Sequence, residues 1–127
     1  MAADAGPILV VDDDEDGRSR LSALLEAAGF GTAEAVTGEA ALPLARELEP
    51  CLALVDVYLP GLSGYEVCHR LKSEFGPSFP VVLVSRERRR DLDRAAGALL
   101  GADDCVSAPV TSDELLPLLE RLLVAHS

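Results

Sequence analysis

The chain contains 127 residues, of which 49% are apolar, and this size and composition fit one domain with its own hydrophobic core. Its 22 acidic and 11 basic residues give a net charge of −11, which repels nucleic-acid phosphates and anionic lipid and favours metal cations and basic protein surfaces. Residues 1–6 lack the basic and apolar regions of a signal peptide, and no apolar run reaches the ~18 residues of a membrane span. We therefore expect a cytoplasmic domain over residues 1–127, with a core of about 7–125, that binds neither nucleic acid directly nor membranes.

Short aliphatic runs alternate along the chain with segments of helical periodicity. The predicted strands are residues 8–11, 31–36, 52–57, 80–85 and 103–108, and a helix is predicted after each of them. Thr37 is expected to cap the second helix, and Ser63 with Glu66 forms an S-x-x-E capping box for the third. Pro43 lies too deep for a first-turn proline, so we expect a kink or a late helix start there. The fourth helix is predicted to face the core through Leu92, Ala95, Ala96 and Leu99.

Five strands alternating with five helices predict an α/β fold, a doubly wound parallel sheet of strand order 2-1-3-4-5. Ligands bind such sheets beyond the carboxyl ends of the strands, where the strand order reverses. Asp12 and Asp13 end the first strand, Asp56 ends the third, and Ser85 ends the fourth. In this order the first and third strands are neighbours, so the three carboxylates would converge and would suit Mg²⁺ or Mn²⁺. The acids that follow them, residues 14–16, are expected to cap the first helix instead.

Four segments of the chain carry a family resemblance. ILVVDDDEDGR, LALVDVYLPGLSGYEV, PVVLVS and GADDCVSAPV together resemble the receiver (CheY-like) domain of bacterial two-component response regulators, which has a flavodoxin-like fold. The resemblance implies that Asp56 is the phosphoacceptor and that Ser85 is the switch hydroxyl. It also implies Mg²⁺ ligands from Asp12, Asp13, Asp56 and the backbone carbonyl of Tyr58.

The same resemblance implies partners and a mode of action. A sensor histidine kinase or phosphotransfer protein would supply the phosphoryl group, and a downstream protein or output domain would receive the signal. Such a domain is not an enzyme in the ordinary sense, because at most it catalyses its own phosphorylation and dephosphorylation.

This chain departs from the family pattern at the switch. Ala108 stands where the family has a lysine, and Cys105 stands where it usually has an aromatic residue. Arg86 opens the run RERRR beside the site and is a possible substitute cation, although we favour a solvated helix start for this run. The resemblance also predicts that the Ala108–Pro109 peptide is cis, a form found in only ~5 to 6% of X-Pro bonds.

Two functions are compatible with these residues. The first is a phosphoacceptor with altered switching, and the second is a pseudo-receiver that acts as a phosphorylation-independent protein-interaction module. Three carboxylates are costly to hold together without a cation, which favours the first. A haloacid dehalogenase-type phosphatase fits less well, because it would need a second aspartate where this chain has Tyr58.

Overall fold

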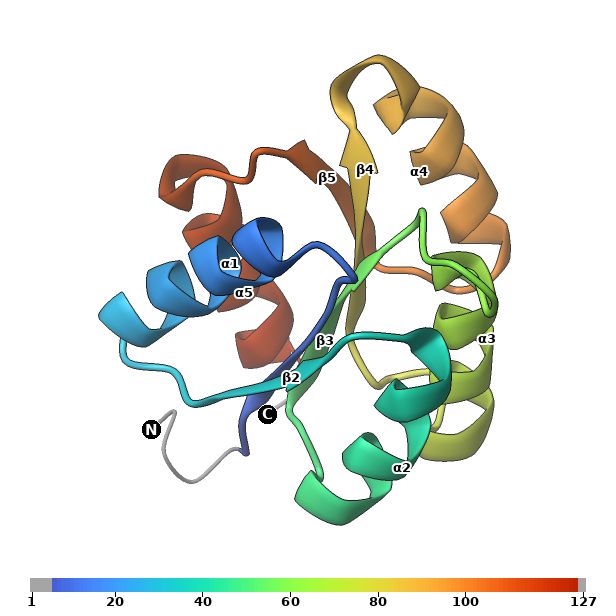
Figure 1. Ribbon diagram of the computed structural model, residues 1–127, viewed down its shortest axis with the longest axis horizontal. Coiled ribbons are helices and arrows are strands. Elements are labelled where there is room, and N and C mark those ends of the chain that lie inside the picture. Colours follow the sequence, from blue (N-terminus) through green and yellow to red (C-terminus); the bar gives the residue numbers. More distant parts are fainter. Residues whose placement is uncertain (1–5, 126–127) are drawn as a thin grey trace.

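The computed structural model describes residues 6–125 and shows five parallel strands alternating with five α-helices (Figure 1). The strands are β1 (Ile8–Val11), β2 (Thr32–Ala35), β3 (Leu52–Asp56), β4 (Val81–Arg86) and β5 (Asp104–Ala108). The helices are α1 (Glu15–Ala27), α2 (Gly38–Leu48), α3 (Gly64–Phe75), α4 (Arg90–Leu99) and α5 (Ser112–Ala125), and a short 3₁₀ helix, Glu87–Arg89, precedes α4. The sheet has the order β2-β1-β3-β4-β5, which confirms the predicted doubly wound, CheY-like fold.

Helices cover both faces of the sheet. Helices α1 and α5 pack on one face, and α2, α3 and α4 lie on the other (Figure 1). Strand β1 shows why its sequence is apolar without interruption: Ile8 and Val10 enter the core beneath α1 and α5, while Leu9 and Val11 enter the opposite core. A strand covered on both faces has no side that favours polar residues.

The register of the strands brings the polar residues to one edge of the sheet. Val11 pairs with Val55, so Asp12 and Asp56 each end a neighbouring strand. Asp56 pairs in turn with Val84, which places Ser85 one residue beyond it on β4. Between β4 and the edge strand β5, Arg86 pairs with Ala108.

The helix starts mostly follow the predicted caps. Thr37 Oγ1 accepts the amide of Ala40 at 3.0 Å, and Ser63 Oγ accepts the amide of Glu66 at 3.3 Å. Of the kink or late helix start expected at Pro43, the late start is wrong, because α2 begins at Gly38 and includes the proline. Pro43 is exposed, so water can reach the carbonyl that its missing N–H would have bonded, and the loss of one hydrogen bond is tolerated.

The predicted inner face of α4 is also wrong. Leu92 is 62% exposed and Leu99 is 88% exposed, whereas the helix buries Asp93 and Gly97. A Cβ at Gly97 would lie 2.5 Å from a methyl carbon of Leu83, so a side chain there would force Leu83 to shift. The carboxylate of Asp93 instead accepts hydrogen bonds from hydroxyl groups of other elements. Aspartate therefore lies on the buried face of α4, where the helical period predicts leucine.

Within residues 6–125, none of the helices combines the length and apolar character that crossing a bilayer requires.

Candidate metal centre

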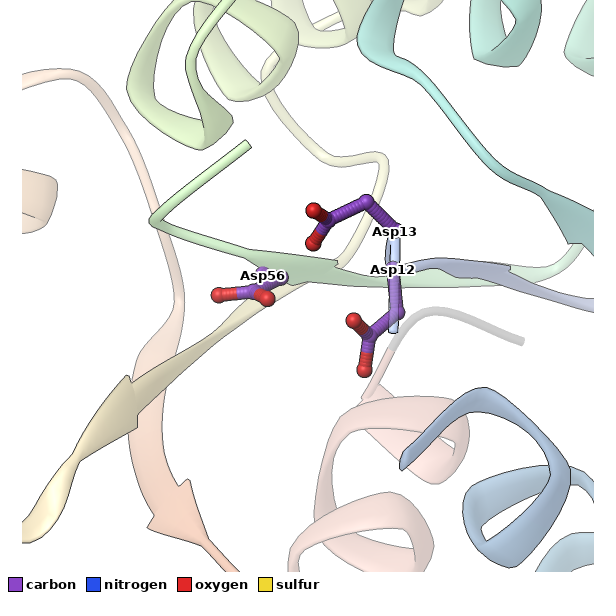
Figure 2. A group of neighbouring side chains, drawn as sticks. All are labelled: Asp12, Asp13 and Asp56. Carbon is purple, nitrogen blue, oxygen red and sulfur yellow. The ribbon is translucent and has the colours of Figure 1, made fainter. Parts of the chain in front are cut away.

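Three carboxylates meet at the carboxyl ends of β1 and β3. One oxygen each from Asp12, Asp13 and Asp56 can be chosen so that all lie within 4.8 Å of one another, as the predicted topology requires. Figure 2 shows Asp12 and Asp13 leaving the end of β1 beside Asp56 at the end of β3. Asp12 is buried, Asp56 is half-buried and Asp13 is exposed, so the cluster is open to water on one side.

Backbone amides fix two of the three carboxylates. The amide of Asp14 donates to Asp12 Oδ1 at 2.9 Å, and the amide of Tyr58 donates to Asp56 Oδ1 at 3.0 Å. Asp14 itself caps α1, because its carboxylate accepts the amide of Gly17 at 2.8 Å. This confirms the prediction that residues 14–16 cap the first helix, since Asp14 is its N-cap and Glu15 and Asp16 lie in its first turn.

The electrostatics of the cluster disfavour three negative charges. Burial raises the pKa of Asp12 to about 6, and the neighbouring charges of Asp56 and Asp13 add to the increase. Burial also raises the pKa of Asp56, although the amide of Tyr58 and the charge of Arg86 partly oppose the increase. A cation among the three acids would reverse this penalty.

The donor set fits a hard divalent cation. Mg²⁺ prefers carboxylate, carbonyl and water oxygens at 2.0–2.1 Å, so two oxygens on one ion lie at most about 4.2 Å apart. The carboxylate oxygens of the cluster, which all lie within 4.8 Å of one another, are therefore close to the separations that one Mg²⁺ ion requires.

A pocket of about 570 Å³ surrounds the acids and is lined further by Ser85, Arg86, Ala108 and Pro109. The Ala108–Pro109 peptide is cis, which confirms that prediction. Ala108 contributes a methyl group where the resemblance leads one to expect an ammonium group. Cys105 is buried in the core, so β5 presents neither the charge nor the ring of the family pattern.

Two arginines line the pocket instead. The guanidinium carbon of Arg86 lies 4.3 Å from the centroid of the Tyr58 ring, a typical cation–π contact, and its side chain is exposed. Arg20 on α1 lines the same pocket, and sequence reasoning missed it. Arg20 lies one helical turn after Gly17, and only the folded structure shows that Gly17 faces Asp12.

The other three arginines of the RERRR run make different contacts or face solvent. Arg89 Nε donates to the phenol oxygen of Tyr58 at 3.2 Å, and Arg90 pairs with Glu114 at 3.1 Å. Arg88 is exposed, which agrees with the solvated helix start that we favoured for this run.

The hydroxyl of Ser85 is bound to a residue that sequence reasoning overlooked. Ser85 is 2% exposed and lines the pocket, but its Oγ donates to the carboxylate of Asp93. Burial alone would raise the pKa of Asp93, yet hydrogen bonds from Ser85, Tyr58 and Tyr65 hold it below the usual value. Asp93 is therefore an ionised carboxylate in the interior beside the site.

Comparison with known proteins gives a consistent result. Residues 8–120 match the family model of the response regulator receiver domain. The transcriptional regulatory protein AfsQ1 of Streptomyces coelicolor is 39% identical over 103 residues, which cover 81% of this chain and 44% of that protein. The probable transcriptional regulatory protein TcrX of Mycobacterium tuberculosis is 37% identical over 123 residues, covering 95% of this chain and 52% of that protein.

The solved structures agree with the sequence relatives. The receiver domain of NtrX from Brucella abortus superposes with a TM-score of 0.86 at 30% identity, and the match covers 92% of this chain and 98% of that one. The chain spans about half the length of the curated relatives it matches.

Proposed function

The chain belongs to the response regulator receiver domain family, and we propose that in this chain Asp56 accepts a phosphoryl group in a magnesium-dependent reaction. The observation that supports this most is the convergence of Asp12, Asp13 and Asp56 within 4.8 Å at the switch point of the sheet. The raised pKa values of Asp12 and Asp56 support the same proposal, because burial of these two carboxylates destabilises their charged forms when no cation is bound. Family members act in two-component signal transduction and are not classical enzymes.

The reaction is a direct transfer to a carboxylate. An oxygen of Asp56 attacks phosphorus, and the phosphorus–nitrogen bond of a phosphohistidine breaks, with its electron pair leaving on the imidazole. From acetyl phosphate, the phosphorus–oxygen bond breaks and acetate leaves. Water can later attack the same phosphorus, which releases inorganic phosphate and restores the Asp56 carboxylate.

Different residues of the chain position the Asp56 carboxylate and compensate the negative charge of the phosphoryl group. Asp12, Asp13, Asp56 and the carbonyl of Tyr58 would hold Mg²⁺, which supplies positive charge against the phosphoryl oxygens. The amide of Tyr58 orients the Asp56 carboxylate through the 3.0 Å hydrogen bond. Ser85 would donate its hydroxyl to a phosphoryl oxygen.

Arg86 is our candidate for the missing lysine. It lines the pocket and its charge already acts on Asp56, whereas Ala108 can form no ion pair. The planar guanidinium suits phosphoryl oxygens, and its stacking on Tyr58 keeps it beside the acceptor.

The partners follow from the same chemistry. A sensor histidine kinase or phosphotransfer protein is the proposed donor, and a downstream protein or output domain is the proposed recipient of the signal. AfsQ1 and TcrX are transcriptional regulatory proteins of which about half matches this chain, so we propose for it the signal-receiving role of such a system.

The test is intact-mass spectrometry after incubation with acetyl phosphate and Mg²⁺. The wild-type chain should gain one phosphate, and both Asp56→Asn and removal of the metal with a chelator should abolish the gain. Arg86→Ala should slow the reaction, while Arg88→Ala, an equal loss of charge outside the pocket, should not. A wild-type chain that stays unmodified would favour the phosphorylation-independent interaction module.

A further inference from the structure

The carboxylate of Asp93 on α4 is an unusual buried group. It is 1% exposed and accepts three side-chain hydroxyls: Tyr58 at 2.6 Å, Tyr65 at 2.5 Å, and Ser85. A buried carboxylate needs such partners, because an ionised group without them is strongly disfavoured in the interior. The phosphoacceptor chemistry described above uses Ser85 but leaves Asp93 without a role.

Two of the three donors belong to the phosphorylation pocket. Ser85 lines that pocket beside Asp56. Tyr58 contacts both groups, since its amide donates to Asp56 Oδ1 at 3.0 Å and its phenol donates to Asp93 Oδ2 at 2.6 Å. Tyr58 thus links Asp93 to Asp56 through two hydrogen bonds, and Ser85 links Asp93 to the pocket that contains Asp56.

The hydrogen of Ser85 can serve only one strong acceptor at a time. A serine hydroxyl carries a single hydrogen, and of the two acceptors near Ser85 Oγ the carboxylate of Asp93 is closer than the backbone oxygen of Arg86, which lies at 3.3 Å. Donation to a phosphoryl oxygen on Asp56 therefore requires the bond to Asp93 to break. Both acceptors are anionic, so one charge-assisted hydrogen bond replaces another of similar strength, and the exchange is energetically accessible.

Resting on the proposed phosphorylation of Asp56, we propose that Asp93 is a positioning residue that holds the Ser85 hydroxyl toward α4, and that phosphorylation transfers this hydrogen bond to the phosphoryl group. Asp93 then keeps its two tyrosine donors but loses the side-chain bond that ties α4 to β4. The signal reaches α4 directly. This route needs neither an aromatic ring at Cys105 nor a lysine at Ala108.

The first test is a double-mutant cycle on the phosphorylation rate with acetyl phosphate and Mg²⁺. Asp93→Asn keeps the shape of the side chain but removes its charge, so it should release Ser85 and raise the rate roughly fivefold. In a Ser85→Ala background, Asp93→Asn should change the rate less than about twofold, because no hydroxyl remains to be released. A purely structural role for Asp93 would change the rate equally in both backgrounds.

A matched control removes a different donor from the same carboxylate. Tyr65→Phe deletes the hydrogen bond to Asp93 Oδ1 but leaves the one between Ser85 and Oδ2. This variant should not accelerate phosphorylation. Asp93→Ala serves as a second variant if the asparagine amide fails to fold against the tyrosine hydroxyls.

The second test follows α4 itself by amide hydrogen exchange. Phosphorylation should speed exchange in Arg90–Leu99 of the wild-type chain, and Ser85→Ala should show fast exchange that no longer responds. The wild-type chain could gain phosphate while Asp93→Asn changes the phosphorylation rate by the same factor with Ser85 and with Ser85→Ala. That result would refute the role of Asp93 and leave the proposed function intact. If the wild-type chain gains no phosphate, the proposed function fails and this inference fails with it.

Discussion

Asp12→Asn should stabilise the metal-free domain at neutral pH, and the size of the effect follows from the raised pKa of this group. Burial raises the pKa of Asp12 to about 6 in the folded state, against 3.8 for an unperturbed aspartate. At 1.36 kcal/mol for each pKa unit, ionised Asp12 opposes folding by about 3 kcal/mol. Asparagine has the same shape, still accepts the amide of Asp14, and does not ionise.

The dependence on pH has a definite sign. A folded-state pKa above the unfolded value means that the contribution of Asp12 is favourable below pH 3.8 and is lost as pH rises toward about 6. Between about pH 5 and pH 7.5, the wild-type chain should therefore lose on the order of 1 kcal/mol of unfolding free energy relative to Asp12→Asn. Both conditions lie above the pI of about 4.4, where the chain keeps a net negative charge.

Urea unfolding in the presence of a chelator measures this difference. The matched control is Asp16→Asn, which removes the same charge from an exposed position in the first turn of α1 and should show no such dependence on pH. An Asp12→Asn effect that is the same at both pH values, or an equal pH dependence for Asp16→Asn, would refute the reasoning. Saturating Mg²⁺ should remove most of the advantage of Asp12→Asn, because the cation compensates the wild-type charge.

Three further outcomes are expected. Mg²⁺ at a hundred times its dissociation constant should raise the unfolding free energy by about 2.7 kcal/mol, which is measurable as a higher melting temperature. Asp13→Asn should remove most of that gain. A melting temperature that changes with neither metal nor chelator would contradict the metal site. Ala108→Lys should increase the rate of phosphorylation of Asp56, measured by intact mass, more in an Arg86→Ala background than in the wild-type chain, because Arg86 already supplies a cation to the pocket; an equal gain in both backgrounds would contradict the role of Arg86. Gly64→Ala should lower the unfolding free energy measured in urea by about 1 to 3 kcal/mol. The reason is that a Cβ there would overlap the backbone oxygen of Asp56 and lie 2.7 Å from the Cα of Val57. An unchanged unfolding free energy would show that the loop after β3 can move to accommodate the methyl group.

The sheet and the acidic cluster were predictable because they depend on local patterns and one topological rule. Unbroken apolar runs such as Ile8–Val11 indicate strands buried on both faces, and parallel strands place their carboxyl ends at one edge. Asp12, Asp13 and Asp56 end their strands, so their convergence required only the strand order that the structure has.

Helix α4 was not predictable in the same way. Its leucines follow a helical period, yet Leu92 and Leu99 face solvent while Asp93 is buried. The inner position is decided by Tyr58, Tyr65 and Ser85, which come from three other elements of the chain. A hydrophobic pattern read along one helix carries no information about hydroxyl groups that meet it only after folding.

The structure of the chain with Mg²⁺ and beryllofluoride, a stable mimic of the phosphoryl group, would test the account most directly. The account predicts beryllofluoride on the carboxylate of Asp56, Mg²⁺ between Asp12, Asp13 and Asp56, and the Ser85 hydroxyl turned from Asp93 to a fluorine atom. Beryllofluoride absent from Asp56, or metal bound away from the three acids, would contradict the proposed function. Beryllofluoride on Asp56 with Ser85 still bonded to Asp93 would contradict the proposed switch alone.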